Sequence, residues 1–256
     1  MSDDAATSGR LASFVGGAAR YGKPAVVFCC SDSDAPIPCD GAWVFRTSLS
    51  RSGGRPRECA LPAWSEDFVT SYLDGRLPLR RYARKPIIGF CGYVGTELRS
   101  RALRVLSESS HVTPNLVMHD QFWAGALSSR FRRASRMRAA REQFVRNLVE
   151  SDYALCIRGA GNFSYRPYEA LSCGRTPVFI NTDCVLPFDE TIDWRRLCVW
   201  VESRDIDMID RKIVEFHDAL DEAAFQQRQH ECRRIWEEWL SPSGFHRHLL
   251  DGIRER

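Results

Sequence analysis

Short apolar runs alternate with amphipathic segments along the last two thirds of the chain. Continuous apolar runs predict buried strands at 87–91, 115–118, 153–157, 177–180 and 197–201. Apolar residues at helical spacing predict helices between and after these strands, at 98–106, 132–149, 167–173, 209–220 and 232–239. Strands that alternate with helices favour an α/β fold with a parallel, doubly wound sheet. In such a sheet, ligands bind at the carboxyl ends of the strands.

The first 84 residues follow a less regular pattern. Strands are predicted at 25–30 and 43–46. Ser, Gly, Arg and Pro dominate 48–62, and that segment therefore predicts a loop. We expect residues 1–84 to form a short, incomplete N-terminal α/β region that ends in a linker. Residues 85–256 are expected to form a C-terminal Rossmann-like domain with closing helices.

Composition narrows the classes of function. With 256 residues, 44% of them hydrophobic, the chain can bury one good core or two modest ones. A net charge of +3 does not favour a protein that binds nucleic acid by charge alone. The ten cysteines include no C-x-x-C pair and the histidines add no ligand spacing, so we expect no metal site and a reducing, cytoplasmic compartment. We find no signal-peptide pattern and no run long enough to span a bilayer; peripheral association with a membrane, through a lipid-linked substrate, stays open.

The most informative stretch of the sequence is 154–180. It predicts a buried strand, a Gly-rich polar turn, a helix that begins near Ser164 and ends at a glycine, and a second buried strand. A turn that leads into a helix presents backbone N–H groups to anions, above all to phosphates. Arg158, Arg166 and Glu169 fall on the same stretch. Two cations, a hydroxyl and a carboxylate suit a phosphate with a sugar attached, so the stretch predicts a nucleotide-sugar site.

Further motifs accompany this stretch: Arg158-Gly159, Ser164-x-Arg166-x-x-Glu169-Ala170-Leu171, Gly174-x-x-Pro177-Val178, the V-L-P-F loop within 183–188, and a strand with a glycine turn at 85–92. Together they resemble the exostosin-type glycosyltransferases over roughly residues 85 to 200. The combination is much longer, and so more specific, than a lone G-x-G-x-x-G. The resemblance implies a two-domain GT-B fold that holds a nucleoside-diphosphate sugar in its C-terminal domain, with the acceptor facing the N-terminal one. It also implies transfer of a hexosyl or glycuronosyl group, with inversion, to a saccharide or glycolipid hydroxyl in polysaccharide biosynthesis, without a catalytic metal or cofactor.

The resemblance also implies roles for the matching positions. The residues expected to bind the nucleotide sugar are Gly92, Arg158, Gly159, Asn162, Ser164, Arg166 and Glu169. Arg158 and Arg166 would face the diphosphate, where preorganised cations stabilise the charge that develops on the leaving group. Glu169 would accept hydrogen bonds from the ribose hydroxyls, and Gly92 would allow a close approach of backbone to donor.

An inverting transfer also needs a general base for the acceptor hydroxyl. Asp32, just past the first predicted strand, is the first candidate, and Glu97 is the second. Trp43 and Trp64, on the presumed acceptor side, are candidates for stacking on a sugar ring. Tyr165, in contrast, is expected to serve packing.

Other interpretations stay open. The N-terminal region is shorter than in the family: either the acceptor domain is minimal, or a partner chain completes it, or the protein is a non-catalytic nucleotide-sugar-binding subunit or a degenerate relative. Arg158 could instead pair with Asp152 or Asp183, and Glu169 could pair with an arginine across its helix. The arginines at 130–146 could form a nucleic-acid surface, but we favour a solvated helix face and expect no nucleic-acid partner.

Overall fold

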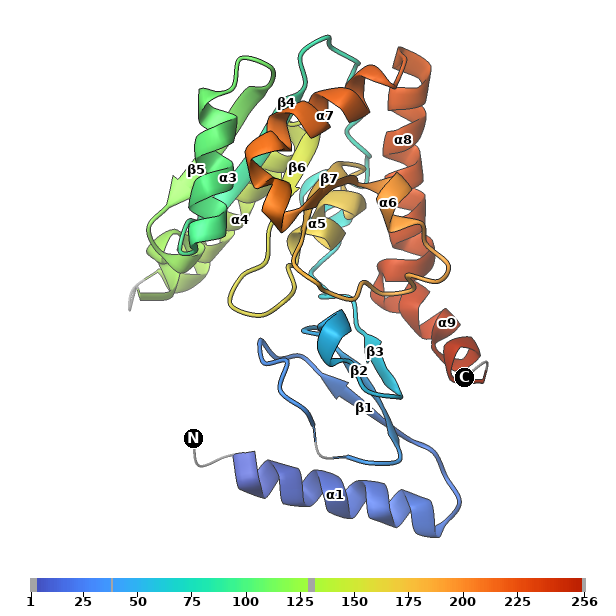
Figure 1. Cartoon of the computed structure of the whole chain (residues 1–256). Coiled ribbons are helices and arrows are strands. Elements are labelled where there is room, and N and C mark those ends of the chain that lie inside the picture. Colours follow the sequence, from blue (N-terminus) through green and yellow to red (C-terminus); the bar gives the residue numbers. More distant parts are fainter. Residues whose placement is uncertain (1–3, 38, 129–131, 255–256) are drawn as a thin grey trace.

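The computed structural model describes residues 4–37, 39–128 and 132–254, and it contains two parallel β-sheets, one above the other in Figure 1. The larger sheet comprises β4 (Ile87–Tyr93), β5 (Thr113–His119), β6 (Tyr153–Cys156), β7 (Thr176–Asn181) and β8 (Val199–Glu202). Its strand order is β5-β4-β6-β7-β8, and each neighbouring pair is parallel. The smaller sheet comprises β1 (Ala25–Cys29), β2 (Ala42–Arg46) and β3 (Glu58–Ala60), also parallel and in that order.

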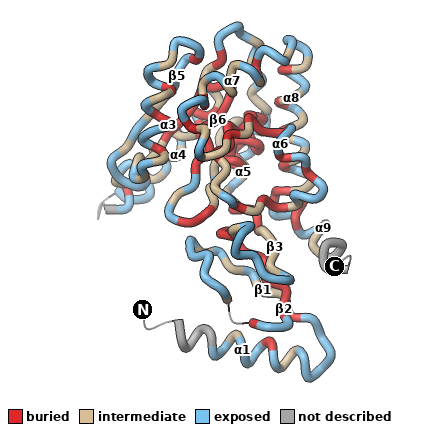
Figure 2. The backbone as a smooth tube through the Cα atoms, in the orientation of Figure 1, coloured by how far each residue is buried: buried red, intermediate tan, exposed pale blue. Residues whose placement is uncertain are grey.

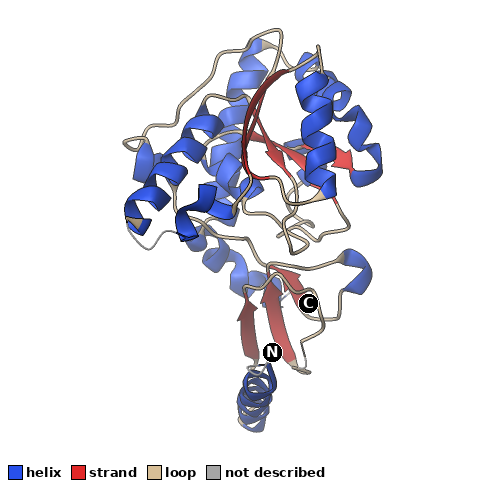
Figure 3. Ribbon diagram, turned by 90° about the vertical axis from the view of Figure 1, so that its left-hand side faces the viewer, coloured by secondary structure: helices blue, strands red, loops and turns tan. Residues whose placement is uncertain are grey.

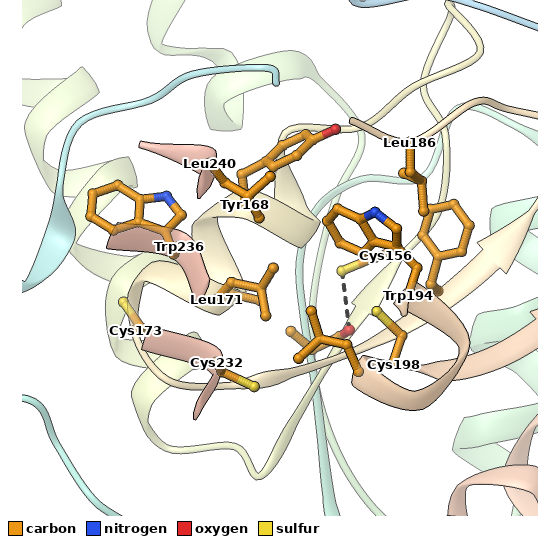
Figure 4. Packing of buried hydrophobic residues seen from close by; sticks show 14 of the residues in the cluster. Cys156, Tyr168, Leu171, Cys173, Leu186, Trp194, Cys198, Cys232, Trp236 and Leu240 are labelled. Atoms are coloured by element: carbon orange, nitrogen blue, oxygen red, sulfur yellow. Dashed lines mark hydrogen bonds between the residues drawn. The ribbon is translucent and has the colours of Figure 1, made fainter. Parts of the chain in front are cut away.

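Helices stand on both faces of the larger sheet. They include α3 (Glu97–Glu108), α4 (Arg133–Val149), α5 (Arg166–Ser172), α7 (Ile209–Asp218) and α8 (Glu222–Ile235). Burial concentrates on the strands and on α5 (Figure 2), and Figure 3 shows the sheet between its helices. Alternate residues of β6 enter two cores: Leu155 packs among residues of α3 and α7, whereas Cys156 packs among residues of α4, α5 and α8 (Figure 4). The predicted α/β fold with a doubly wound parallel sheet is confirmed.

The strand order reverses between β4 and β6. From β4 the chain passes through α3 to β5 on one side, and α4 then carries it back to β6 on the other side of β4. In open α/β sheets, such a reversal leaves a crevice at the carboxyl ends of the two strands, and ligands bind there. The β4–α3 turn and the β6–α5 loop border that crevice.

The two sheets exchange segments across the predicted boundary at residues 84 and 85. Before that boundary, α2 (Phe68–Tyr72) packs on α4 and α5, and Asp67 pairs with Arg233 of α8 (Oδ1–Nη1, 2.7 Å). From the other end of the chain, α9 (Pro242–Arg254) packs on the smaller sheet, where the ring centroids of Phe245 and Phe45 lie 5.6 Å apart. Neither unit is therefore one continuous segment of sequence.

Several elements differ from the sequence-based expectation. The long helix α1 (Asp4–Arg20) was not predicted, because glycines interrupt a pattern with few large apolar residues. β3 lies within the predicted loop 48–62, because its pairing with β2, rather than its own residues, makes it a strand. The last strand begins at Val199 instead of Leu197, because 194–197 forms the short helix α6 (Trp194–Leu197).

Candidate functional site

Arg99 of α3 bridges the crevice between β4 and β6. Its Nη1 donates to the carbonyl oxygen of Tyr93 at 2.9 Å and its Nη2 to that of Ile157 at 3.2 Å. Arg99 is only 5% exposed, and its Nε has no hydrogen-bond partner among the described residues. Burial lowers the pKa of Arg99 to about 10, and the nearby Arg166 acts in the same direction. A buried cation that lacks a carboxylate partner favours the binding of an anion.

The sequence motifs do not single out Arg99, although the helical spacing contains a signal for it. Arg99 lies three residues before Ala102 and seven before Leu106, which are both fully buried. It therefore occupies a position on the apolar face of α3. Arginine is almost never buried without a partner, so an arginine on such a face, beside the end of a strand, indicates a site.

Arg166 approaches the same crevice from α5. Its Nη2 donates to the carbonyl oxygen of Cys91 at 3.0 Å, and its guanidinium carbon lies 4.6 Å from the ring centroid of Phe90. Its buried Nε has no partner among the described residues, and burial lowers the pKa of the guanidinium. Gly92 has a φ of +153°, and a Cβ there would stand 2.2 Å from Nη2 of Arg166. The glycine thus makes room for the Arg166 side chain, so these two expected site residues are in contact.

Glu169 lies on α5 and is only 4% exposed. Its Oε1 pairs with Nη1 of Arg141, on α4, at 3.0 Å. Burial raises the pKa of Glu169, while Arg141 and Arg166 act to lower it. The sequence analysis left open a pairing with an arginine across the same helix; the observed partner lies on the neighbouring helix α4 instead. The carboxylate is engaged within the protein, and its role toward ribose stays a prediction.

A cleft of about 890 Å³ opens at the carboxyl ends of β7 and β8, beside the start of α3. Its lining comprises Thr96, Glu97, Leu98, Arg158, Asn181, Thr182, Asp183, Glu202, Ser203 and Arg204. The exposed Arg158 side chain has no hydrogen bond or ion pair with any described residue. Neither alternative partner is engaged with it, since Asp152 pairs with Arg80 and Asp183 accepts from Ser52. Arg158 is therefore available to a ligand in this cleft.

The loop between β6 and α5 carries the other expected donor residues. Asn162 joins this loop to the N-terminal unit: its backbone N–H donates to Ser48 Oγ at 3.0 Å and its Nδ2 to Ser50 Oγ at 2.9 Å. Gly159 donates its N–H to the Phe163 carbonyl oxygen at 3.2 Å, which closes the loop on itself.

Ser164 was expected near the start of the helix, but α5 begins at Arg166. Ser164 Oγ instead accepts the Arg166 N–H at 3.3 Å, in the turn that precedes the helix. The N–H groups of Gly159 and Arg166 are thus used within the protein, and the donor contacts of this loop stay predictions.

The two base candidates lie in different places. Glu97 is exposed in the cleft that Arg158 lines. Asp32 does not line that cleft; its backbone lies against Gly161, where an added Cβ would stand 2.7 Å from the Asp32 carbonyl oxygen. The carboxylate of Asp32 is exposed and has no hydrogen-bond or ion-pair partner in the described part of the chain.

The two tryptophans expected to stack on a sugar do not lie open to one. Trp43 is 9% exposed and packs within the smaller sheet and α9. Trp64 is half-buried; its Nε1 donates to the Leu240 carbonyl oxygen at 3.1 Å, and its ring stacks on His246. That expectation is wrong, because both rings pack against α9: Trp43 belongs to the cluster around Phe245, and Trp64 stacks on His246.

The described residues contain neither a cluster of metal ligands nor a membrane-spanning helix. Within them, no group of three or more His, Cys, Asp or Glu side chains could hold a metal ion. No described helix combines the length and the apolar character that crossing a membrane requires.

Comparison with known proteins identifies relatives of the region around this crevice. Residues 99–215 match the family model of the Exostosin GT47 domain. Exostosin-1 of Drosophila melanogaster is 28% identical over 111 residues, which cover 43% of this chain and 14% of that protein. A probable glucuronoxylan glucuronosyltransferase of Arabidopsis thaliana is 33% identical over 84 residues, covering 33% of this chain and 18% of that protein.

These alignments span less than a fifth of the curated relatives' own length. Among solved structures, the crystal structure of TarM aligns with 88% of this chain and 54% of that one, at 11% identity and a TM-score of 0.44. The family match contains Arg99, Arg158, Arg166 and Glu169. Residues 99–215 of this chain are therefore similar to the Exostosin GT47 domain, in agreement with the resemblance that the sequence motifs carry.

Proposed function

We propose that this chain is a glycosyltransferase that moves a sugar from a nucleoside-diphosphate sugar to a hydroxyl of a saccharide or glycolipid. The family match and the activities for which the plant relatives are named support sugar transfer. The observation that carries the proposal is that Arg99 and Arg166 lie at the strand reversal, where doubly wound sheets bind ligands, while Arg158 lines the cleft at the carboxyl ends of β7 and β8.

The arginines account for the binding of a diphosphate. Arg99 and Arg166 both have lowered pKa values, an unpaired Nε and hydrogen bonds only to carbonyl oxygens on the crevice side. A phosphate would relieve the repulsion between them and accept charge-assisted hydrogen bonds. Arg158 is exposed and unpaired among the described residues, so it can reach a ligand without breaking an existing contact.

Transfer proceeds by one displacement. The acceptor oxygen forms a bond to the anomeric carbon while the bond from that carbon to the phosphate oxygen breaks, and the electron pair leaves with the diphosphate. The arginines stabilise this developing charge, each by about 2–4 kcal/mol if they act as oxyanion donors do. We propose that they do so in place of a metal ion. Attack from the face opposite the leaving group inverts the anomeric carbon.

Asp32 is the proposed general base and takes the proton of the acceptor hydroxyl. Its carboxylate has no partner among the described residues, and its backbone touches the loop that carries Arg158. It belongs to the N-terminal unit, and its backbone meets that loop at Gly161. Glu97 is the second candidate, because it shares the cleft with Arg158.

The nucleic-acid alternative finds less support along α4. Arg138 pairs with Glu142 at 2.8 Å and Arg141 pairs with Glu169, so two of the basic side chains are already neutralised. Arg130, at the start of that cluster, lies outside the described residues.

The ten cysteines are free thiols, which supports a reducing, cytoplasmic location. Peripheral membrane association and a partner chain for the N-terminal unit stay predictions.

The test is a transfer assay on the purified chain. UDP-, GDP- and ADP-sugars are each combined with xylo-, cello- and chito-oligosaccharides, with and without EDTA, and the products are examined by mass spectrometry and by NMR of the new anomeric proton. We expect one donor to give a product of inverted configuration that EDTA does not diminish. Loss of product with EDTA would overturn the metal-independent step alone. Absence of product from every pair would contradict the proposed transfer.

A further inference from the structure

Tyr165 presents an aromatic ring at the seam between the two units. It is 46% exposed, whereas its ring partner Phe163 is half-buried, with ring centroids 5.6 Å apart. Burial of part of the ring raises the pKa of the Tyr165 hydroxyl, and Cys30 and Asp32 of the N-terminal unit add to that shift. The ring belongs to the larger unit, and the loop that carries it lies against the loop after β1, since a Cβ on Gly161 would stand 2.7 Å from the Asp32 carbonyl oxygen.

The loop that faces Tyr165 is held in place on both sides of Asp32. Arg46 is 2% exposed, and its Nη2 donates to the carbonyl oxygens of Ser33 at 2.7 Å and Ala35 at 3.0 Å. Thr47 Oγ1 donates to the Ser31 carbonyl oxygen at 3.1 Å. These bonds use only the backbone of the loop and leave the carboxylate of Asp32 without a partner among the described residues.

The second acid of the loop is engaged. Asp34 Oδ2 accepts from Ser50 Oγ at 3.0 Å, and Ser50 Oγ also accepts from Nδ2 of Asn162. These two hydrogen bonds, through Ser50, connect the loop 31–35 to the loop that carries Tyr165. The two loops are therefore fixed relative to each other; one carries an exposed aromatic ring, and the other carries a carboxylate that has no partner among the described residues.

We propose that Tyr165 and the loop 31–35 form the acceptor subsite, in which a pyranose ring stacks on Tyr165 and places its hydroxyl at the carboxylate of Asp32. A sugar suits this place because one of its faces presents C–H groups to an aromatic ring while its hydroxyls meet polar neighbours. The same two loops carry the hydroxyl groups of Ser31, Ser33 and Ser164. The inference rests on the proposed function, since it names the binding place of the second substrate.

The experiment compares Tyr165→Ala with Tyr165→Phe, which keeps the ring, and with Tyr21→Ala, which removes a tyrosine that is 81% exposed on the N-terminal unit. Because Tyr165 is exposed, its loss should leave the melting temperature unchanged. Saturation-transfer NMR first measures binding of xylohexaose, cellohexaose and chitohexaose to each protein. Steady-state transfer then gives the acceptor KM, and calorimetry gives the nucleotide Kd.

We expect Tyr165→Ala to weaken saccharide binding and raise the acceptor KM about tenfold, with the nucleotide Kd unchanged. Tyr165→Phe and Tyr21→Ala should match the wild type within about twofold. Equal saccharide binding by wild type and Tyr165→Ala, or no saccharide signal from the wild type, would overturn the acceptor subsite. Absence of nucleotide binding by the wild type itself would instead contradict the donor site, so the two failures are distinguishable.

Discussion

Gly161, on the loop after β6, lies directly against the backbone of Asp32, on the loop after β1. A Cβ on Gly161 would stand 2.7 Å from the carbonyl oxygen of Asp32 and 2.8 Å from its Cα. Both neighbours are backbone atoms, so the contact cannot be relieved by turning a side chain. This contact joins the side that would hold the donor to the side that would hold the acceptor.

Substitution of this glycine should separate the two loops. We expect Gly161→Ala to lower the free energy of unfolding by about 1–3 kcal/mol, because the added methyl group overpacks a backbone contact. Transfer should fall further than nucleotide affinity, since the donor residues stay on the larger unit. Urea unfolding, calorimetry and the transfer assay measure the three quantities.

Gly53→Ala is the matched control, because nothing lies within 4 Å of a Cβ at that position. It should leave stability and transfer near the wild-type values. If Gly161→Ala were as stable and as active as this control, the two loops would not be in the contact described here.

The buried pair of Arg141 and Glu169 makes a second prediction. Arg141→Ala should lower the free energy of unfolding at pH 7 by about 3 kcal/mol, because a carboxylate that is 4% exposed loses its cation. The double variant Arg141→Ala/Glu169→Gln should recover part of that loss, because the remaining side chain is neutral. A double variant less stable than Arg141→Ala would contradict the pairing.

The same pair predicts a pH dependence. Burial raises the pKa of Glu169 above its ordinary value of 4.5, and removing Arg141 removes a group that opposes this shift. The folded state then takes up a proton at a higher pH than the unfolded state does, so stability falls as the pH rises from 4.5 through the folded-state pKa. The difference in free energy of unfolding between wild type and Arg141→Ala should therefore shrink as the pH is lowered from 7 toward 4.5. Urea unfolding at each pH measures this difference.

The contribution of Asp67 to stability should depend on pH in the opposite direction. Burial alone would raise its pKa, but hydrogen bonds from Arg233, Thr70 and the Val69 N–H outweigh that effect and hold the pKa below 3.8. Its stabilising contribution is present above pH 3.8 and is lost as the pH falls through the lower, folded-state pKa. Asp67→Asn should lower the free energy of unfolding by about 1–3 kcal/mol at pH 7, since charge-assisted hydrogen bonds contribute that much.

Asp74→Asn is the control for Asp67, because it removes the same charge from an exposed position in the same region. Its stability at pH 7 should match that of the wild type. A constant difference between wild type and Asp67→Asn down to pH 2 would show that the carboxylate charge is not what joins α2 to α8.

The regular part of the fold could be predicted from sequence because its strands are buried on both faces. Runs such as 153–157 and 177–180 are apolar throughout, and helices at 3.6-residue spacing separate them. The smaller sheet could not be predicted to the same extent. β3 has only three residues and becomes a strand by pairing with β2, a contact distant in sequence.

The residues of the candidate site, too, could be predicted from sequence only in part. Arg158, Arg166 and Glu169 are found by their motifs because they lie on one short stretch of sequence. Arg99 reaches that stretch only through the pairing of β4 with β6, and the Arg141 contact to Glu169 depends on how α4 packs on α5. Contacts between separate elements decide which of the motif residues are free for a ligand, and local sequence does not contain them.

The most direct test of the central claim is isothermal titration calorimetry of UDP, GDP, ADP and CDP into wild type, Arg158→Ala and Arg84→Ala. Both arginines are exposed and unpaired among the described residues, so neither substitution should alter stability, but only Arg158 lies in the cleft. We predict that one nucleotide binds the wild type and Arg84→Ala equally, and that Arg158→Ala weakens its Kd by about tenfold to a hundredfold, the loss expected for a charge-assisted hydrogen bond. The same Kd for Arg158→Ala and wild type, or no binding of any of the four nucleotides to the wild type, would contradict a donor site that includes Arg158 at the carboxyl ends of the strands.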